Sequence, residues 1–386
     1  MSLTRKILFW FILLALAGIL SLAAAELMLR LTVKTQDQLP GYVSHSNFYT
    51  YPSDINFSFT NEDGKQISIH TDENGLRNQP GALEKADVIL VGDSFIFGIN
   101  TNQEQTLTGC LLRKGIKAYN AGMGGYSTYN ELFLLRNLIR KVHPSSVILF
   151  FYLGNDFHDN YFDRSHLSAS NAAYTTTRPG SFNLISEVKH SLGKLCLKSK
   201  AGTILYQHVY CRWFKSPSWK VIASLSLSEM LSYRLVPNAE MKIAEEKTDQ
   251  AFQELAKLGR EKGIKIYLVG IPSKAQVYQA FHEISNFSLD DNSRNYALET
   301  IKTGYSFARP DQIAHALAAK NGLEYISLLP LFRANRNRNI YYQIDSHWTA
   351  QGQKLAADYL LHTIFKTAGA QNSQAARTPG AIPNGP

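Results

Sequence analysis

An alternation of strand-like and helical segments, running from about residue 85 to residue 366, constrains the fold more than any other feature. Residues 87–93 (DVILVGD) contain an apolar run without alternation, which is typical of a strand buried on both faces of a sheet. Further strands are predicted within residues 116–122, 145–156, 264–272 and 323–328. Segments with helical periodicity between them predict an α/β fold with a parallel sheet. We expect a three-layer α/β/α sandwich with a flavodoxin-like parallel sheet of about five strands.

The predicted helices have recognisable boundaries. An apolar stripe predicts a helix within residues 128–142, and a long amphipathic segment predicts another over about 240–262. Pro310 stands near the first turn of a helix that Gly322 would end. Thr349 is a suitable N-cap for the last helix. These boundaries place a helix between successive strands, as parallel pairing requires.

The chain divides into four predicted regions. Residues 1–30 form a transmembrane anchor, and residues 31–84 form a stalk with an edge strand or hairpin that turns at Asn74-Gly75. Residues 85–366 form the main domain, with an insertion at about 157–235 where the regular pattern is lost. The tail 367–386 contains few large apolar residues and is predicted to be disordered.

The N-terminal segment carries a targeting signal. Arg5 and Lys6 precede 19 uncharged residues, Ile7 to Ala25, a length that just spans the hydrocarbon core of a bilayer. Positive charge on the short N-terminal side predicts that the rest of the chain lies outside the cytoplasm, on the periplasmic side of a bacterial inner membrane. Ala23 and Ala25 also form an A-x-A cleavage site, so a cleaved signal peptide stays open as the alternative. Both interpretations export the main domain.

Charge and cysteine content limit the classes of partner. The formal net charge is +9, but the basic residues do not form the dense face or arm of a nucleic-acid-binding protein. Attraction to an anionic lipid or polysaccharide fits this charge better.

The spacing of cysteines and histidines matches no zinc site, so we expect neither metal nor cofactor. In an oxidising compartment Cys196 and Cys211 are close enough in sequence to form a disulfide, which leaves Cys110 as a core thiol.

Polar residues gather after the predicted strands. Ser94 follows the first strand, a glycine-rich loop (NAGMGGYS) the second, Leu-Gly-Asn155-Asp the third, and Asp345-Ser-His347 precedes the last helix. In parallel α/β sheets, ligands bind at the carboxyl ends of the strands. We therefore expect these segments to meet at one edge of the sheet.

These residue types are the ones that acyl transfer through serine requires. Ser94 is the candidate nucleophile, His347 the candidate base, and Asp345 the acceptor for the second imidazole nitrogen. The Ser94 amide, the Gly125 amide and the Asn155 side chain are the candidate oxyanion donors. The alternatives are structural: a serine that makes a turn, a glycine required for positive φ, and an asparagine that satisfies a buried loop.

Three neighbouring residues receive other roles. Asp93 is expected to cap the helix that follows it. Trp348 is expected to pack and hold the turn that carries His347. Lys274, in the segment PSKAQVY after the fourth strand, is a candidate contact for an anionic substrate, with a solvated lysine as the alternative.

The segments GDSFIFG, NAGMGGYS, YLGNDFHDN and DSHWTAQG resemble the four sequence blocks of the SGNH hydrolases, also called GDSL-like esterases, and of their membrane-anchored bacterial branch. The resemblance spans about 85–156 and 264–365. It implies a Ser94 nucleophile, Gly125 and Asn155 as oxyanion donors, and a His347–Asp345 pair. The Asp-x-His spacing is shorter than the usual Asp-x-x-His and is similar to that of exopolysaccharide acetyltransferases of the alginate type.

We therefore expect an extracytoplasmic serine esterase that hydrolyses O-acyl esters, above all O-acetyl esters, of a cell-envelope glycan or glycolipid. One alternative is an O-acyltransferase that uses the same triad to acetylate exopolysaccharide hydroxyls. The other is a catalytically idle glycan-binding protein of the envelope. The expected partners are an acylated small molecule or envelope polysaccharide and, through the N-terminal helix, the membrane.

Overall fold

The computed structural model describes residues 3–32, 40–61, 63–162, 227–279, 300, 302–342 and 345–366. The chain divides into two compact units, Met1–Gln38 with Thr176–Trp219, and Leu39–Thr175 with Lys220–Pro386. The second unit contains the predicted main domain. The predicted Cys196–Cys211 disulfide, most of the insertion and the predicted disordered tail lie outside the described residues.

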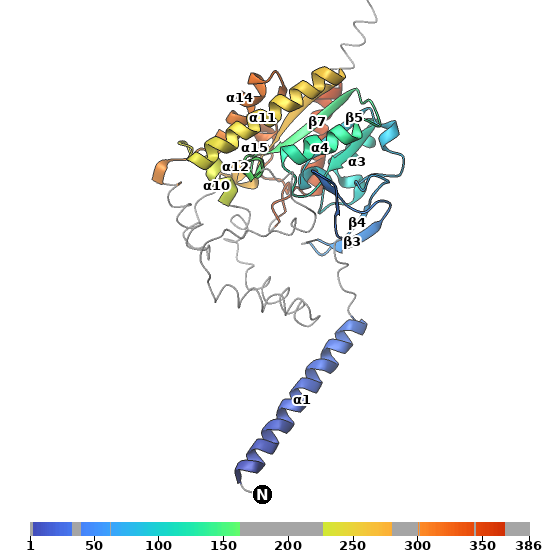
Figure 1. Cartoon of the computed structure of the whole chain (residues 1–386), viewed down its shortest axis with the longest axis vertical. Coiled ribbons are helices and arrows are strands. Elements are labelled where there is room, and N and C mark those ends of the chain that lie inside the picture. Colours follow the sequence, from blue (N-terminus) through green and yellow to red (C-terminus); the bar gives the residue numbers. More distant parts are fainter. Residues whose placement is uncertain are drawn as a thin grey trace, which may run out of the picture. The chain divides into compact units, whose positions relative to one another are not determined.

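A five-stranded parallel sheet forms the centre of the second unit (Figure 1), as the sequence predicts. Its strands lie in the order β6-β5-β7-β8-β9, which is the flavodoxin-like order for five successive strands. The strand order reverses beside β5, so the carboxyl ends of β5 and β7 flank the switch point where α/β proteins bind ligands. The strands are β5 (Val88–Gly92), β6 (Ala118–Gly122), β7 (Ser146–Tyr152), β8 (Lys265–Ile271) and β9 (Glu324–Ser327).

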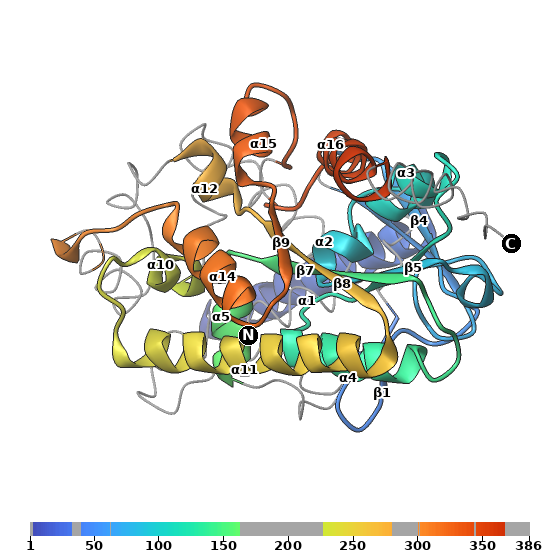
Figure 2. The same ribbon diagram turned by 90° about the horizontal axis from the view of Figure 1, so that it is seen from above.

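Helices cover both faces of this sheet (Figure 2). Alternate residues of β5 face opposite sides, because Ile89 and Val91 join one buried cluster whereas Val88 and Leu90 join another. One face is covered by α4 (Thr128–Leu138), α11 (Ala239–Lys262) and α14 (Arg309–Lys320). The other face is covered by α3 (Leu107–Leu112), α15 (Leu329–Ala334) and α16 (Ala350–Leu360). The predicted three-layer sandwich is therefore confirmed.

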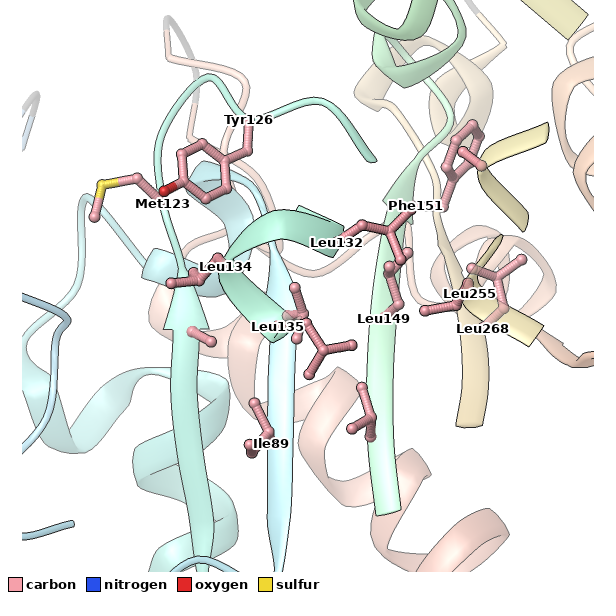
Figure 3. Close-up of a cluster of buried hydrophobic side chains, with 14 of the residues drawn as sticks. Ile89, Met123, Tyr126, Leu132, Leu134, Leu135, Leu149, Phe151, Leu255 and Leu268 are labelled. Atoms are coloured by element: carbon pink, nitrogen blue, oxygen red, sulfur yellow. The ribbon is translucent and has the colours of Figure 1, made fainter. Parts of the chain in front are cut away.

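The larger cluster of buried side chains lies between β5, β7, β8 and the helices α4 and α11 (Figure 3). Leu132 and Leu135 of α4 face Ile89 and Leu149 of the sheet. Each such buried side chain contributes about 1.5–3 kcal/mol relative to an exposed one. This packing holds the ends of β5 and β7, from which the candidate site residues follow.

The segment from Tyr42 to Leu83 packs as part of the same unit and is not a separate stalk. Tyr49, Tyr51, Ile67 and Leu83 are almost fully buried in the larger cluster. The segment contains an antiparallel hairpin, but its turn lies between Thr60 and Gln66 and not at the predicted Asn74-Gly75. A second, shorter antiparallel pair precedes it. Its elements are β1 (Val43–Ser44), β2 (Tyr49–Thr50), β3 (Asn56–Thr60), β4 (Gln66–His70) and the 3-10 helix η1 (Leu83–Lys85).

Several short helices also join the unit. The helix α2 (Ser94–Phe97) is the one expected after Asp93, and the π-helical segment η7 (Leu361–Lys366) continues the predicted last helix. The sequence pattern does not predict the others, because each spans two turns or less, which is too short to show helical periodicity. These are α5 (Asp156–Phe162), α10 (Leu227–Tyr233), α12 (Lys274–Tyr278) and the 3-10 helix η2 (Gln103–Gln105). The helices α5 and α10 form the two ends of the predicted insertion.

The N-terminal helix α1 spans Leu3–Thr32 and includes the predicted apolar segment. Across the part of the chain that the structure describes, no helix combines the length and the apolar character needed to cross a membrane. The transmembrane anchor stays a prediction from the sequence.

Candidate active site

In each of three loops at the carboxyl edge of the sheet, the neighbouring residues are buried and one position is partly exposed to solvent. Within residues 88–98 only Ser94 is partly exposed, and within residues 147–157 only Asn155 is. Within residues 118–128 only the adjacent glycines Gly124 and Gly125 are partly exposed. Loops whose other residues are buried therefore present the predicted nucleophile and the predicted oxyanion donors.

Ser94 is the first residue of α2, directly after the turn that follows β5. Asp93 is the N-cap, and its carboxylate accepts a hydrogen bond from the Phe95 amide at 2.9 Å, which confirms the predicted cap. Burial raises the pKa of Asp93 to about 6, although the Phe95 bond and the charge of His347 act in the opposite direction. Gly98, in the left-handed conformation (φ 72°), ends the helix after a single turn.

His347 and Asp345 reach Ser94 from the loop before α16. The Ser94 hydroxyl oxygen lies 2.6 Å from His347 Nε2, although the two residues are 253 positions apart in sequence. The other imidazole nitrogen, Nδ1, hydrogen-bonds to Asp345 Oδ1. The structure thus brings together the three residues that the sequence predicts as a triad.

The charges in this group reinforce one another. Burial lowers the pKa of His347, but the hydrogen bond and negative charge of Asp345, with a further contribution from Asp93, raise it above 6.5 overall. Burial raises the pKa of Asp345, but the bond and charge of His347 and a bond from Asn100 outweigh burial and lower it to about 2. At neutral pH Asp345 is therefore an anion that stabilises a protonated imidazole.

Aromatic packing holds the loop of His347 in place. Trp348 is buried, stacks on Phe332 at 4.9 Å and meets the edge of Phe95 at 5.2 Å between ring centroids. The same Phe95 ring lies 4.8 Å from the imidazole of His347. Phe95, next to Ser94, thus links the nucleophile to the base, and Trp348 packs as the sequence predicts.

Asn100 is a site residue that sequence reasoning missed. Its side-chain amide donates to Asp345 Oδ2 at 2.6 Å, so both carboxylate oxygens of Asp345 have partners. The Asn100 carbonyl accepts from the Tyr342 hydroxyl at 2.7 Å and from the Asn61 side chain at 3.3 Å. An asparagine in a loop carries no periodic signal, and only the tertiary contact reveals its position.

A buried arginine holds the loop that carries Asn100. The Arg77 guanidinium is almost inaccessible and donates to the backbone carbonyls of Phe97, Gly98 and Thr101 at 3.0, 2.6 and 2.5 Å. These bonds satisfy the last turn of α2 and the residues after it. Arg77 comes from the segment predicted as a stalk, so that segment also helps to order the site.

The predicted oxyanion donors Gly125 and Asn155 lie on loops at the carboxyl edge of the sheet, and among the described residues neither makes a hydrogen bond to Ser94. A methyl group built on Gly124 would lie 3.8 Å from the Ser94 β-carbon. Gly125 adopts φ 77°, and in the described part of the chain neither its amide nor that of Ser94 donates an intramolecular hydrogen bond. The Asn155 side-chain amide donates to Asp159 Oδ2 at 2.8 Å, which fixes its orientation and leaves its second hydrogen for a ligand.

Buried carboxyl groups lie beneath this side of the site. Both carboxyl oxygens of Glu131 are buried and have no hydrogen-bond partner among the described residues. Burial, together with the charges of Asp93 and Asp159, raises the pKa of Glu131 well above its ordinary value. Burial and the same neighbours also raise the pKa of Asp156.

Lys274 has a partner within the protein. Its side chain is 7% exposed, and its ammonium group donates to the Tyr342 carbonyl at 2.9 Å, just before the loop of Asp345. Contact between Lys274 and a substrate stays a prediction. Within the described residues, no group of three or more His, Cys, Asp or Glu side chains is arranged to hold a metal ion.

Comparison with known proteins gives one family match. Residues 231–383 match the model of the family described as "SGNH hydrolase-like domain, acetyltransferase AlgX", a range that contains Asp345 and His347 but not Ser94. No curated protein matches the chain.

Solved structures similar to the chain include an acetyl xylan esterase, AlAXEase (13% identity, TM-score 0.36, 72% of this chain and 98% of the other). They also include a putative lipolytic protein of the G-D-S-L family from Desulfitobacterium hafniense (12%, TM-score 0.35, 71% and 97%). A third is a GDSL-like lipase from Bacteroides thetaiotaomicron (13%, TM-score 0.35, 75% and 92%).

The parallel sheet, the residues at its carboxyl edge and the family match define an enzyme of the serine hydrolase and acyltransferase class. Residues 231–383 of the chain are similar to an SGNH hydrolase-like domain. Its chemistry is accordingly the hydrolysis of acyl esters or the transfer of acetyl groups.

Proposed function

We propose that the protein is a serine esterase that cleaves O-acyl esters, above all O-acetyl esters, through a Ser94–His347–Asp345 triad. The observation that carries the proposal is the 2.6 Å contact between the Ser94 hydroxyl and His347 Nε2, with Asp345 bound to the opposite imidazole nitrogen. This is the geometry in which a base can take the proton of its nucleophile.

In the proposed reaction, Ser94 Oγ attacks the ester carbonyl while its proton passes to His347 Nε2. The tetrahedral intermediate carries a negative oxygen, which the amides of Ser94 and Gly125 and the Asn155 side chain stabilise. When the intermediate collapses, the C–O bond to the leaving alcohol breaks and the alcohol takes the proton from His347. A water molecule, deprotonated by the same imidazole, then attacks the acyl-Ser94 ester. The bond from the acyl carbon to Ser94 Oγ breaks, the carboxylic acid leaves, and His347 returns the proton to Oγ.

The proposed substrate is an acylated glycan or glycolipid of the cell envelope, met on the periplasmic side of the bacterial inner membrane. The support is the sequence: an uncharged segment from Ile7 to Ala25 behind Arg5 and Lys6, and a net charge of +9 that suits an anionic surface. The membrane through α1, and an acylated small molecule or polysaccharide through Ser94, are the proposed partners.

A second candidate function is O-acyl transfer to a polysaccharide hydroxyl. It is favoured by the match of residues 231–383, which contain the proposed acid and base, to a family described as an acetyltransferase. The first half of the reaction is the same. In the second half a sugar hydroxyl replaces water, gives its proton to His347 and takes the acyl group from Ser94.

The test uses the full-length chain and p-nitrophenyl acetate, with and without an oligosaccharide acceptor. Ser94→Ala is compared with Ser53→Ala, which changes an exposed serine on the same unit. We expect Ser94→Ala to abolish turnover and labelling by a fluorophosphonate probe, and Ser53→Ala to leave both unchanged. Equal turnover by Ser94→Ala and wild type would contradict the proposal. Acetylated oligosaccharide, detected by mass spectrometry, would favour transfer over hydrolysis.

A further inference from the structure

We infer that Tyr49 is a positioning residue that aims the Gly125 amide at the oxyanion. This inference rests on the proposed function. Its basis is a hydrogen bond of 2.7 Å from the Tyr49 hydroxyl to the carbonyl oxygen of Gly124. Tyr49 lies 75 positions before Gly124, in the N-terminal segment outside the sequence blocks of the predicted site.

The geometry of one peptide group connects Tyr49 to the oxyanion donor. The Gly124 carbonyl and the Gly125 amide belong to the same planar peptide, and no described peptide bond is cis. In a trans peptide the C=O and N–H bonds point in opposite directions. A bond that holds the Gly124 oxygen against Tyr49 therefore turns the Gly125 N–H away from that buried ring.

This peptide needs such a restraint because it lies between two glycines. Without side chains, glycine residues rotate readily, and Gly125 already adopts φ 77°, a conformation that other residues rarely accept. A rotation of the peptide would exchange the positions of the N–H and the C=O. It would then present a carbonyl oxygen, instead of a donor, to the negative oxygen of the intermediate.

The Tyr49 side chain is itself held firmly. Its ring is 4% exposed and lies edge-on to the Tyr126 ring, with 4.9 Å between centroids. The Tyr126 hydroxyl bonds to both the Tyr49 amide and the Tyr49 carbonyl. Since Tyr126 directly follows Gly125, these bonds hold the glycine loop and β2 together from both sides.

The peptide lies beside the nucleophile. A β-carbon built on Gly124 would lie 3.8 Å from the Ser94 β-carbon and 4.0 Å from the Tyr42 hydroxyl. The loop is therefore close enough to Ser94 for its amide to act on a bound acyl group. A change in the orientation of this peptide should affect the reaction more than the binding of substrate.

The test is Tyr49→Phe in the full chain, which keeps the ring and removes one hydroxyl. Tyr51→Phe is the matched control, because Tyr51 is another buried tyrosine of the same segment and its ring packs against Phe57 and Phe97. With p-nitrophenyl acetate we expect Tyr49→Phe to lower kcat about tenfold, less than the ~10²–10³ typical for loss of a donor itself. We expect KM to change by less than about twofold, as for an interaction made only in the transition state, and Tyr51→Phe to retain wild-type kcat.

A spectroscopic measurement separates positioning from a general structural role. In an acyl-enzyme trapped on Ser94, stronger hydrogen bonds to the ester carbonyl lower its infrared stretching frequency. We expect this frequency to rise in Tyr49→Phe and to stay unchanged in Tyr51→Phe, also when thermal unfolding shows that both variants are less stable.

An unchanged carbonyl frequency in Tyr49→Phe, or a kcat equal to that of Tyr51→Phe, would overturn the inference and leave the proposed function intact. The proposed function fails by a different result, namely full turnover by Ser94→Ala. The two failures are therefore distinguishable.

Discussion

On one side of Ser94 stand His347 and Asp345, and on the other stand Gly125 and Asn155. The first side is already in contact with the nucleophile and is held by charge, through the bonds from His347 and Asn100 to Asp345. The second side makes no described hydrogen bond to Ser94 and is positioned by Tyr49 and Asp159. Proton transfer should therefore depend on pH and on Asp345, whereas oxyanion binding should depend on the orientation of donors. Variants on the two sides can test this difference.

The largest effect is expected for Asp345→Asn. It removes the hydrogen bond and the charge that raise the pKa of His347, and in serine proteases the corresponding change costs about 10⁴ in kcat. Because the base must be neutral to act, activity falls as the pH drops through the pKa of His347. A lower pKa therefore moves this low-pH limb of kcat/KM to lower pH. The pH profile of p-nitrophenyl acetate hydrolysis measures both changes. A limb that stays in place would contradict the proposed role of Asp345.

A smaller effect is expected for Asn155→Ala. Loss of one oxyanion donor typically lowers kcat by about 10²–10³. Asn155 does not contribute to the pKa of His347, so the low-pH limb should stay at its wild-type position. The same pH profile supplies the measurement. A shifted low-pH limb would show that the two sides are not separate. A kcat within threefold of wild type would contradict the role of Asn155 as an oxyanion donor.

Asn100→Ala should lower kcat about tenfold, because Asn100 acts only through Asp345. Removal of its hydrogen bond also takes away one of the interactions that hold the pKa of Asp345 near 2. Asn61→Ala is the control: Asn61 donates to the Asn100 carbonyl and lies one step further from the triad. Steady-state kinetics should rank the variants in that order, and a larger loss in Asn61→Ala would contradict the assignment.

The smallest effect on activity, within about twofold, is expected for Glu131→Gln beneath the oxyanion side. The effect on stability should depend on pH. The folded-state pKa of Glu131 is raised, so its favourable contribution is complete below the unfolded-state pKa of about 4.5 and is lost as pH rises through the folded-state pKa. The variant should therefore gain stability over wild type as pH rises. Tm values from pH 5 to pH 9 measure this gain, and a difference independent of pH would refute it.

Local sequence features were sufficient to predict the sheet and the residues around Ser94. Strands buried on both faces have a composition that is legible without tertiary information, and parallel strands bring their carboxyl ends to one edge. Asp93 is predictable as a cap because aspartate is preferred at helix N-termini, and Trp348 as a packing residue because it adjoins His347. The rule for strand ends also places Lys274 near the site, but it does not say which way a side chain turns in a short helix.

Residues that act through tertiary contacts were not predictable. Tyr49, Arg77 and Asn100 have no sequence spacing that relates them to Ser94, and their partners are mostly backbone carbonyls, which every residue possesses. The segment from Tyr42 to Leu83 resembled a stalk because its buried residues are spread over short hairpins without a long periodic run. Its packing depends on the surface formed by the rest of the unit.

The 253-residue separation between Ser94 and His347 has a consequence for the synthesis of the enzyme. The nucleophile and all five strands of the sheet are made before the base, so a partly synthesised chain can acquire much of its sheet while it has no means of deprotonating Ser94. Closing so long a loop carries an entropic cost that only the complete core repays. Esterase activity should therefore appear late in refolding, after the recovery of helical circular dichroism. Catalysis therefore requires the last segment, and a chain that has not yet acquired this segment would be inactive.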